Sequence, residues 1–122
     1  MKRENILKIR TFDFSLRIIK LTKLLMDARK EYVLTKQLLR SGTAIGALVR
    51  EAEYAESKKD FVHKLHIALK EANETEYWIE LLYKSDYINT TEFDSIATDL
   101  KDILKLLISS IKTMKKNEQF FN

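Results

Sequence analysis

The chain of 122 residues contains no proline and only two glycines. Proline and glycine mark most turns of β-sheet proteins, so this chain offers few places at which strands can reverse direction. Hydrophobic residues make up 45% and charged residues 33% of the sequence, a balance typical of folded helical proteins and not of disordered ones. We therefore predict an all-α protein, long enough to bury one core as a single domain.

Apolar residues recur at steps of four and three in four segments, which is the spacing of one helix face. The segments run from about Phe12 to Lys30, Val33 to Ala55, Lys58 to Ser85 and Thr90 to Lys116. Short connections between such helices predict an antiparallel up-and-down four-helix bundle over residues 1–122. The ends, residues 1–11 and 117–122, are expected to be mobile.

The same pattern predicts which residues face the core and where two helices begin. Ser57 with Asp60, and Asn89 with Glu92, have the spacing of N-terminal capping boxes. The residues expected to face the core are Phe14, Ile18, Leu21 and Leu25; Leu34, Leu38, Ser41, Ile45, Leu48 and Ala52; Phe61, Leu65, Ala68, Ala72, Thr75, Ile79 and Leu82; and Phe93, Ile96, Leu100, Ile103, Leu107, Ile111 and Met114.

The absence of cysteine excludes disulfides, thiolate metal sites and cysteine nucleophiles. The start of the chain lacks the continuous apolar core of a signal peptide, and no apolar run approaches the length of about 18 residues that a membrane span needs. We expect a cytoplasmic protein.

Both glycines, Gly42 and Gly46, lie within the second predicted helix, where each costs about 1 kcal/mol relative to alanine. A phosphate-binding loop is excluded, because Gly46 is followed by Ala47 and Leu48 and not by lysine and serine or threonine. Residues four apart share a helix face, so the glycines allow another helix to approach closely. That helix can belong to the same chain or to another subunit, and the sequence favours an oligomer contact without deciding the question.

Charge is distributed unevenly along the chain. Residues 1–40 have a balance of +7, residues 41–100 one of −6 and residues 101–122 one of +3. The first and last helices of an up-and-down bundle are neighbours, so their basic stripes can form one surface that binds nucleic-acid phosphates. The alternative is an ordinary solvated face. The stripes consist of Arg17, Lys20 and Lys23 in the first helix and Lys101, Lys105, Lys112 and Lys116 in the last.

The stretch from Lys36 to Leu82 resembles the four-helix-bundle proteins encoded in intervening sequences of bacterial 23S ribosomal RNA genes, which are often labelled ribosomal proteins. A relative of that family is the accessory variability protein of diversity-generating retroelements. The most specific part is Arg40-Ser41-Gly42, Ile45-Gly46-Ala47, Glu51-Ala52, Lys59-Asp60-Phe61 and Ile67-Ala68-Leu69. Ala44 and Leu48 depart from the family pattern, in which serine and asparagine are common.

The resemblance implies a ring-shaped homopentamer that binds nucleic acid and has no established enzymatic activity. The sequence gives less support to two other kinds of site, a metal site and an acid–base site. Asp60, His63 and His66 have the spacing of a metal site on one helix, but no second histidine motif completes it. Glu71, Glu74, Glu76 and Glu80 form an acidic band without a recognisable partner base.

We thus expect a non-enzymatic homo-oligomer, without cofactor or metal, that binds RNA or DNA with weak sequence preference. The alternative function is a scaffold that docks a partner protein.

Overall fold

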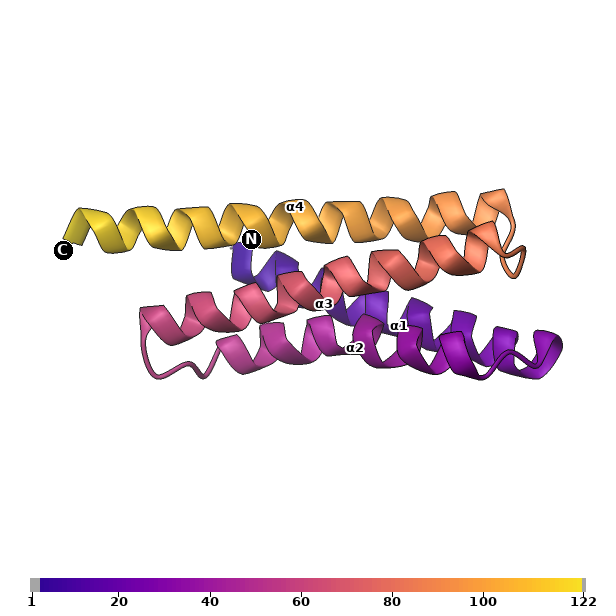
Figure 1. Cartoon of the computed structure of the whole chain (residues 1–122). Helices are drawn as coiled ribbons and strands as arrows, with labels where there is room; N and C mark the ends of the chain where they lie inside the picture. The colour runs from indigo at the N-terminus through magenta and orange to yellow at the C-terminus, as the bar shows by residue number, and fades with distance from the viewer. Residues whose placement is uncertain (1–2, 122) are drawn as a thin grey trace.

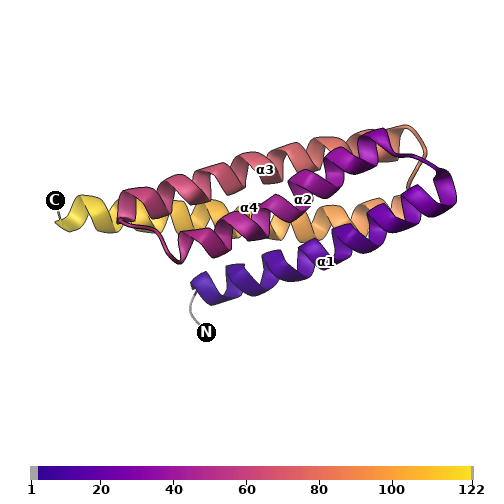
Figure 2. The same ribbon diagram turned by 90° about the horizontal axis from the view of Figure 1, so that it is seen from below.

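The structure is a computed structural model, which describes the backbone of residues 3–121 and the side chains of residues 6–116. Four helices make up this part of the chain. The helices are α1 (Arg3–Arg29), α2 (Val33–Ala52), α3 (Lys58–Lys84) and α4 (Thr90–Phe121). Each packs against the next, and α1 also packs against α4. Consecutive helices run in opposite directions, and α4 extends beyond the start of α1 (Figure 1, Figure 2). The predicted all-α, up-and-down bundle is confirmed.

The core follows the predicted stripes closely. In α4, Ile96, Leu100, Ile103, Leu107 and Ile111 are buried as expected. In other helices the buried position is shifted by one residue at some points, so that Thr22, Thr35 and Val62 are buried while their neighbours Leu21, Leu34 and Phe61 are half-buried. A four-three spacing drifts slowly around a helix with 3.6 residues per turn, so two adjacent positions share the core-facing side.

The N-terminal part of the chain is helical and contributes to the core. Residues 1–11 were expected to be mobile, yet α1 begins at Arg3 and both Leu7 and Thr11 are buried. These two residues continue the spacing of Phe14 and Ile18, and the Thr11 hydroxyl donates to the Leu7 carbonyl oxygen at 2.8 Å. At the other end, α4 continues past Lys116 to Phe121. The expected mobile residues 1, 2 and 122 lie outside the described residues.

Both predicted capping boxes form, in slightly different ways. The amide of Asp60 donates to Ser57 Oγ at 3.0 Å, and the Asp60 carboxylate accepts from the amide of Glu56 at 3.2 Å. At α4, the amide of Glu92 donates to Asn89 Oδ1 at 2.8 Å and the amide of Asn89 donates to Glu92 Oε1 at 3.0 Å. The bonds accepted by Ser57 and Asn89 satisfy N–H groups that the first turn of each helix leaves without a partner.

The start of α2 is capped by a residue that the sequence pattern did not reveal. Glu31 accepts from the amides of Leu34 at 3.0 Å and Thr35 at 2.8 Å, and from the Thr35 hydroxyl at 2.7 Å. Burial raises the pKa of Glu31, but the hydrogen bonds from the Thr35 hydroxyl and the nearby amides outweigh it, so the pKa lies below its ordinary value. The carboxylate therefore stays charged at the positive end of the helix.

Two helices end at residues with a left-handed backbone. Lys30 after α1 has φ of 55° and Asp86 after α3 has φ of 68°. After Asp86, the amide of Tyr87 donates back to the Leu82 carbonyl oxygen at 2.8 Å, as in the usual C-terminal cap. Among the described residues, no helix is long and apolar enough to cross a bilayer.

Candidate nucleic-acid interface

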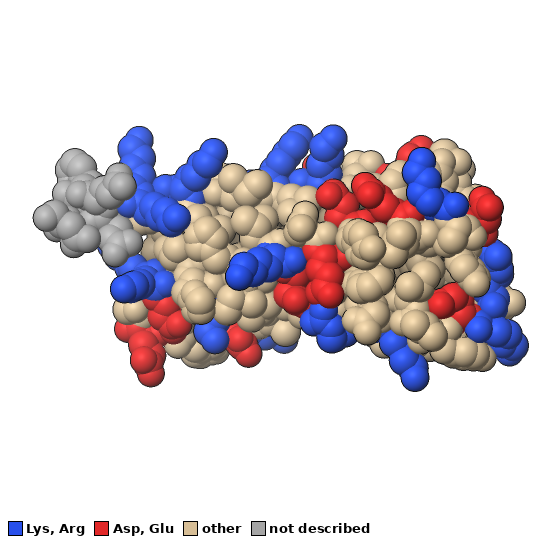
Figure 3. All heavy atoms as spheres, in the orientation of Figure 1, with Lys and Arg blue, Asp and Glu red and all other residues tan. Residues whose placement is uncertain are grey.

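A row of exposed lysines runs along α4, and we call it the α4 lysine row: Lys101, Lys105, Lys112 and Lys116. At 100° per residue, their side chains fall within an arc of about 60°, on the side opposite to the buried Ile103 and Leu107. All four are exposed, and no ion pair joins them to another described residue. Figure 3 shows basic side chains projecting along the edge that α4 occupies in Figure 1.

The α4 lysine row contains little acid to neutralise it. Between Lys101 and Lys116 the sequence has one acidic residue, Asp102. Its carboxylate faces Arg10 of α1, with Oδ2 3.7 Å from Arg10 Nη1. The row is therefore a surface of net positive charge.

The three predicted basic residues of α1 differ in their contacts, because Arg17 pairs with α4 whereas Lys20 and Lys23 form no ion pair with its described residues. Arg17, predicted to meet phosphates, reaches across to α4: its guanidinium pairs with the Asp99 carboxylate and donates to Ser95 Oγ at 2.7 Å. It fastens α1 to α4, because a bidentate guanidinium holds two acceptors at once. Lys20 and Lys23 are exposed.

A groove of about 710 Å³ lies between α1 and the first turns of α4. Lys20 and Lys23 stand on its α1 side, and Leu21, Leu24 and Ile96 supply apolar lining. The α4 lysine row starts further along α4, beyond the residues that line this groove. The structure thus brings the two predicted stripes onto neighbouring helices, but at different heights along the bundle.

Both glycines face α1 of the same chain. A Cβ atom at Gly42 would come within 2.9 Å of Ile18 Cγ1 and Cγ2, and one at Gly46 within 3.2 Å of the Thr11 carbonyl oxygen. Helices α1 and α2 approach closely because these side chains are missing. Gly42 is buried, whereas Gly46 also lines a groove of about 480 Å³ between α1 and α2, so an oligomer contact there stays a prediction.

The outer face of α1 carries a second apolar stripe, which we call the α1 stripe. Its four residues follow the helical spacing of three and four and are each about half exposed: Ile9 47%, Phe12 49%, Leu16 52% and Ile19 47%. Phe12 and Ile19 also line the groove beside Gly46. Because the opposite face of α1 is buried in the bundle, this helix presents apolar side chains on two sides. A contiguous exposed apolar patch marks a surface that contacts another molecule.

The family model for the 23S rRNA-intervening sequence protein matches residues 3–109 of the chain. The chain belongs to this family. A crystal structure of a protein of unknown function from the S23 ribosomal protein family of Bacteroides thetaiotaomicron is 53% identical, covers 91% of this chain and 99% of its own, and superimposes with a TM-score of 0.90. No curated protein matches the sequence.

The match to the 23S rRNA-intervening sequence family divides the α4 lysine row. Lys101 and Lys105 lie within the matched residues, and Lys112 and Lys116 lie beyond them. Lys20, Lys23 and the α1 stripe all lie within the match.

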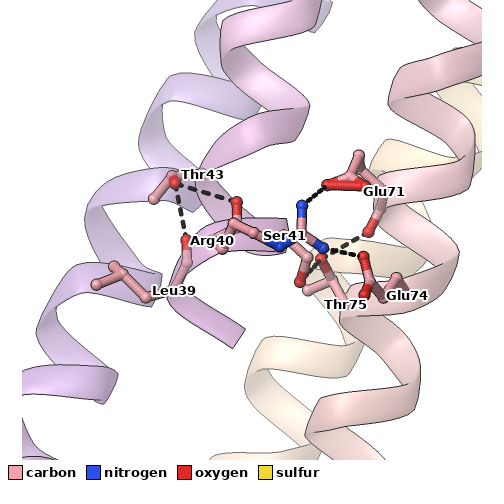
Figure 4. A network of polar contacts seen from close by, with 7 residues as sticks. All are labelled: Leu39, Arg40, Ser41, Thr43, Glu71, Glu74 and Thr75. Atoms are coloured by element: carbon pink, nitrogen blue, oxygen red, sulfur yellow. Dashed lines mark hydrogen bonds and ion pairs between the residues drawn. The ribbon is translucent and has the colours of Figure 1, made fainter. Parts of the chain in front are cut away.

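In this family member, the stretch that carries the resemblance joins α2 to α3 (Figure 4). Arg40 pairs with Glu71 at 2.8 Å and with Glu74, and hydrogen bonds to Glu74 and then Glu71 raise the pKa of Arg40. One helical turn after Glu71, the Thr75 hydroxyl is buried between α2 and α3. It lies 2.9 Å from Ser41 Oγ and 2.8 Å from the Glu71 carbonyl oxygen. The carbonyl can only accept, so Thr75 donates to it and Ser41 donates to Thr75.

The remaining candidate residues lie apart from one another. Two members of the acidic band, Glu71 and Glu74, pair with Arg40 of the same chain, while Glu76 and Glu80 are exposed. Asp60 caps α3, and within the described residues no three His, Cys, Asp or Glu side chains gather as metal ligands would.

Sequence reasoning missed the α1 stripe and the pairing of Arg17. The spacing of Ile9, Phe12, Leu16 and Ile19 was available as a signal, but it runs beside the stronger core stripe, and its first residue, Ile9, falls in the segment expected to be mobile. The pairing of Arg17 with Asp99 depends on the register of α1 against α4, which the periodicity of either helix does not specify.

Proposed function

We propose that the protein is a non-enzymatic, cytoplasmic homo-oligomer that binds RNA or DNA through phosphate contacts. The observation that carries this proposal is the α4 lysine row, four exposed ammonium groups on one side of one helix without acidic partners. Lysines that meet phosphates release condensed counterions, which gives affinity without sequence specificity. Lys20 and Lys23 add positive charge on α1, at a different height along the bundle.

The α1 stripe supports assembly. It offers four large, half-exposed apolar side chains to a second copy, and the groove beside Gly46 continues it onto α2. Repeating the α4 lysine row around an oligomer raises avidity for a long polyanion without any new contact. The number of subunits, five, follows the family resemblance, as does a relationship to the accessory variability protein of diversity-generating retroelements.

A salt titration tests the nucleic-acid proposal. We expect binding to duplex DNA and structured RNA to fall by about 0.9 log units per log unit of salt for each phosphate neutralised on duplex DNA. Changing Lys105, Lys112 and Lys116 to glutamine should lower this slope. A control with the exposed Lys36, Lys59 and Lys70 of α2 and α3 changed to glutamine removes the same charge and should lower it less.

Absence of binding at low salt, or a slope that the α4 variant and the control change equally, would contradict the proposal. Those results favour the alternative function, a scaffold whose binding to a partner protein persists after nuclease treatment and after neutralisation of the lysines.

A further inference from the structure

The α4 lysine row is divided into two pairs by an apolar residue. Lys101 and Lys105 are one turn apart, as are Lys112 and Lys116, and a rise of 1.5 Å per residue separates the members of each pair by about 6 Å. The inner lysines, Lys105 and Lys112, are about 10 Å apart along the helix. Between them, on the same side of α4, lies Ile108, which is 40% exposed.

The shape of the bundle leaves this side of α4 open to a large partner. The core-facing residues of α4 are on the opposite side, and the helix extends beyond the start of α1 (Figure 1, Figure 2). Asp102, the acidic residue within the row, is turned toward Arg10. A rod-shaped polyanion can therefore lie against the whole row.

We propose that this partner is duplex DNA and that α4 lies across its major groove, with one lysine pair on each phosphate backbone. This inference rests on the proposed function and specifies its ligand. The major groove is about 12 Å wide, which the inner lysines span, whereas the minor groove of about 6 Å is too narrow to separate the pairs. The apolar Ile108 falls where the groove interrupts the phosphates.

Other nucleic acids fit the row less well. A single strand presents one backbone, so it gives no reason for a gap between two pairs. Duplex RNA has a major groove that is deep and narrow, and its wide minor groove is lined with 2′-hydroxyl groups, to which Ile108 offers no hydrogen bond. Duplex DNA combines two backbones at the required separation with thymine methyl groups in the groove between them.

The test compares full-length protein binding to a DNA duplex, the RNA duplex of the same sequence and the single DNA strand, by fluorescence anisotropy at several salt concentrations. Changing either pair, Lys101 with Lys105 or Lys112 with Lys116, to glutamine should lower the salt slope on duplex DNA by about 1.8, the value for two phosphates. Methyl green, which occupies the major groove, should displace the protein, and netropsin, which occupies the minor groove, should not.

The outcomes separate this inference from the proposed function. Lysine-dependent binding that is equal for the single strand, stronger for duplex RNA or displaced by netropsin would overturn duplex recognition and leave nucleic-acid binding in place. A slope that only one of the two pairs changes would also overturn it. No binding to any of the three ligands at low salt would defeat the proposed function itself.

Discussion

At the scale of single residues, the contact between Gly42 and Ile18 determines how closely α1 and α2 pack. The missing side chain allows Ile18, which is fully buried, to lie where a Cβ atom would collide with two of its carbons at 2.9 Å. Replacing an exposed glycine within a helix by alanine normally raises the free energy of unfolding by about 1 kcal/mol. At Gly42 that gain competes with overpacking, which costs about 1–3 kcal/mol.

We predict that Gly42→Ala lowers the free energy of unfolding by about 1 kcal/mol, because overpacking exceeds the gain in helix propensity. The same change in an Ile18→Ala background, where the colliding carbons are absent, should be neutral or stabilising. Chemical denaturation of the four proteins measures both values. Equal effects of Gly42→Ala in the two backgrounds would show that the close approach to Ile18 is not what keeps glycine at this position.

At the scale of secondary structure, the start of α2 depends on a carboxylate that lies just before the helix. Glu31 satisfies the amides of Leu34 and Thr35, and its pKa is lowered in the folded protein. A group with a lowered folded-state pKa contributes stability above its unfolded value, and this contribution disappears as the pH falls through the folded value.

We predict that Glu31→Gln destabilises the protein by about 1 kcal/mol at pH 7, the usual effect of losing a helix cap. The difference from the unaltered protein should shrink as the pH is lowered below the ordinary value of 4.5, because protonation then weakens the same cap. Urea unfolding of both proteins from pH 7 to pH 3 measures this difference in the free energy of unfolding. The matched control is Glu76→Gln, which removes an exposed carboxylate of α3 that caps no helix. If the stability difference between Glu31→Gln and the unaltered protein stayed the same from pH 7 to pH 3, the capping role would be contradicted.

The elements differ in how far the sequence predicts them, for physical reasons. In α4 a single apolar face and a capping box at Asn89 specify both the start and the buried residues. In α1 apolar residues on two faces obscure the pattern, so its first turns were missed. The partner of Gly42 is a side chain on another helix, and helix periodicity predicts that something packs closely there but not that it is Ile18. Likewise, the cap by Glu31 lies outside the usual serine, threonine, asparagine and aspartate signals.

At the scale of the whole molecule, the α1 stripe and the α4 lysine row lie on different helices, so assembly and nucleic-acid binding can be tested separately. We predict that the unaltered protein sediments as an oligomer and that Leu16→Glu shifts it toward monomer, because a charge replaces a large apolar side chain at the proposed subunit interface. Analytical ultracentrifugation provides the measurement. Leu16 is 52% exposed, so the change should leave the bundle folded.

Tyr77→Glu serves as the matched control, since Tyr77 of α3 is 57% exposed and lies away from the α1 stripe. It should leave the oligomer intact. A monomer of the unaltered protein at roughly 50 µM, which corresponds to association weaker than about −6 kcal/mol, would contradict assembly. Equal dissociation by both variants would place the interface elsewhere.

The packing of α1 against α4 also has a consequence for synthesis of the protein on the ribosome. Within the bundle, α1 is made before the other three helices and closes the bundle against α4, through Arg17, Ser95 and Asp99. While α4 is still being synthesised, α1 can pack only against α2, and apolar residues on two of its sides remain in contact with water. Local contacts between consecutive helices form quickly, whereas the closing contact must wait until α4 has been synthesised. Until then, the apolar side chains of α1 that α4 covers are open to non-native contacts.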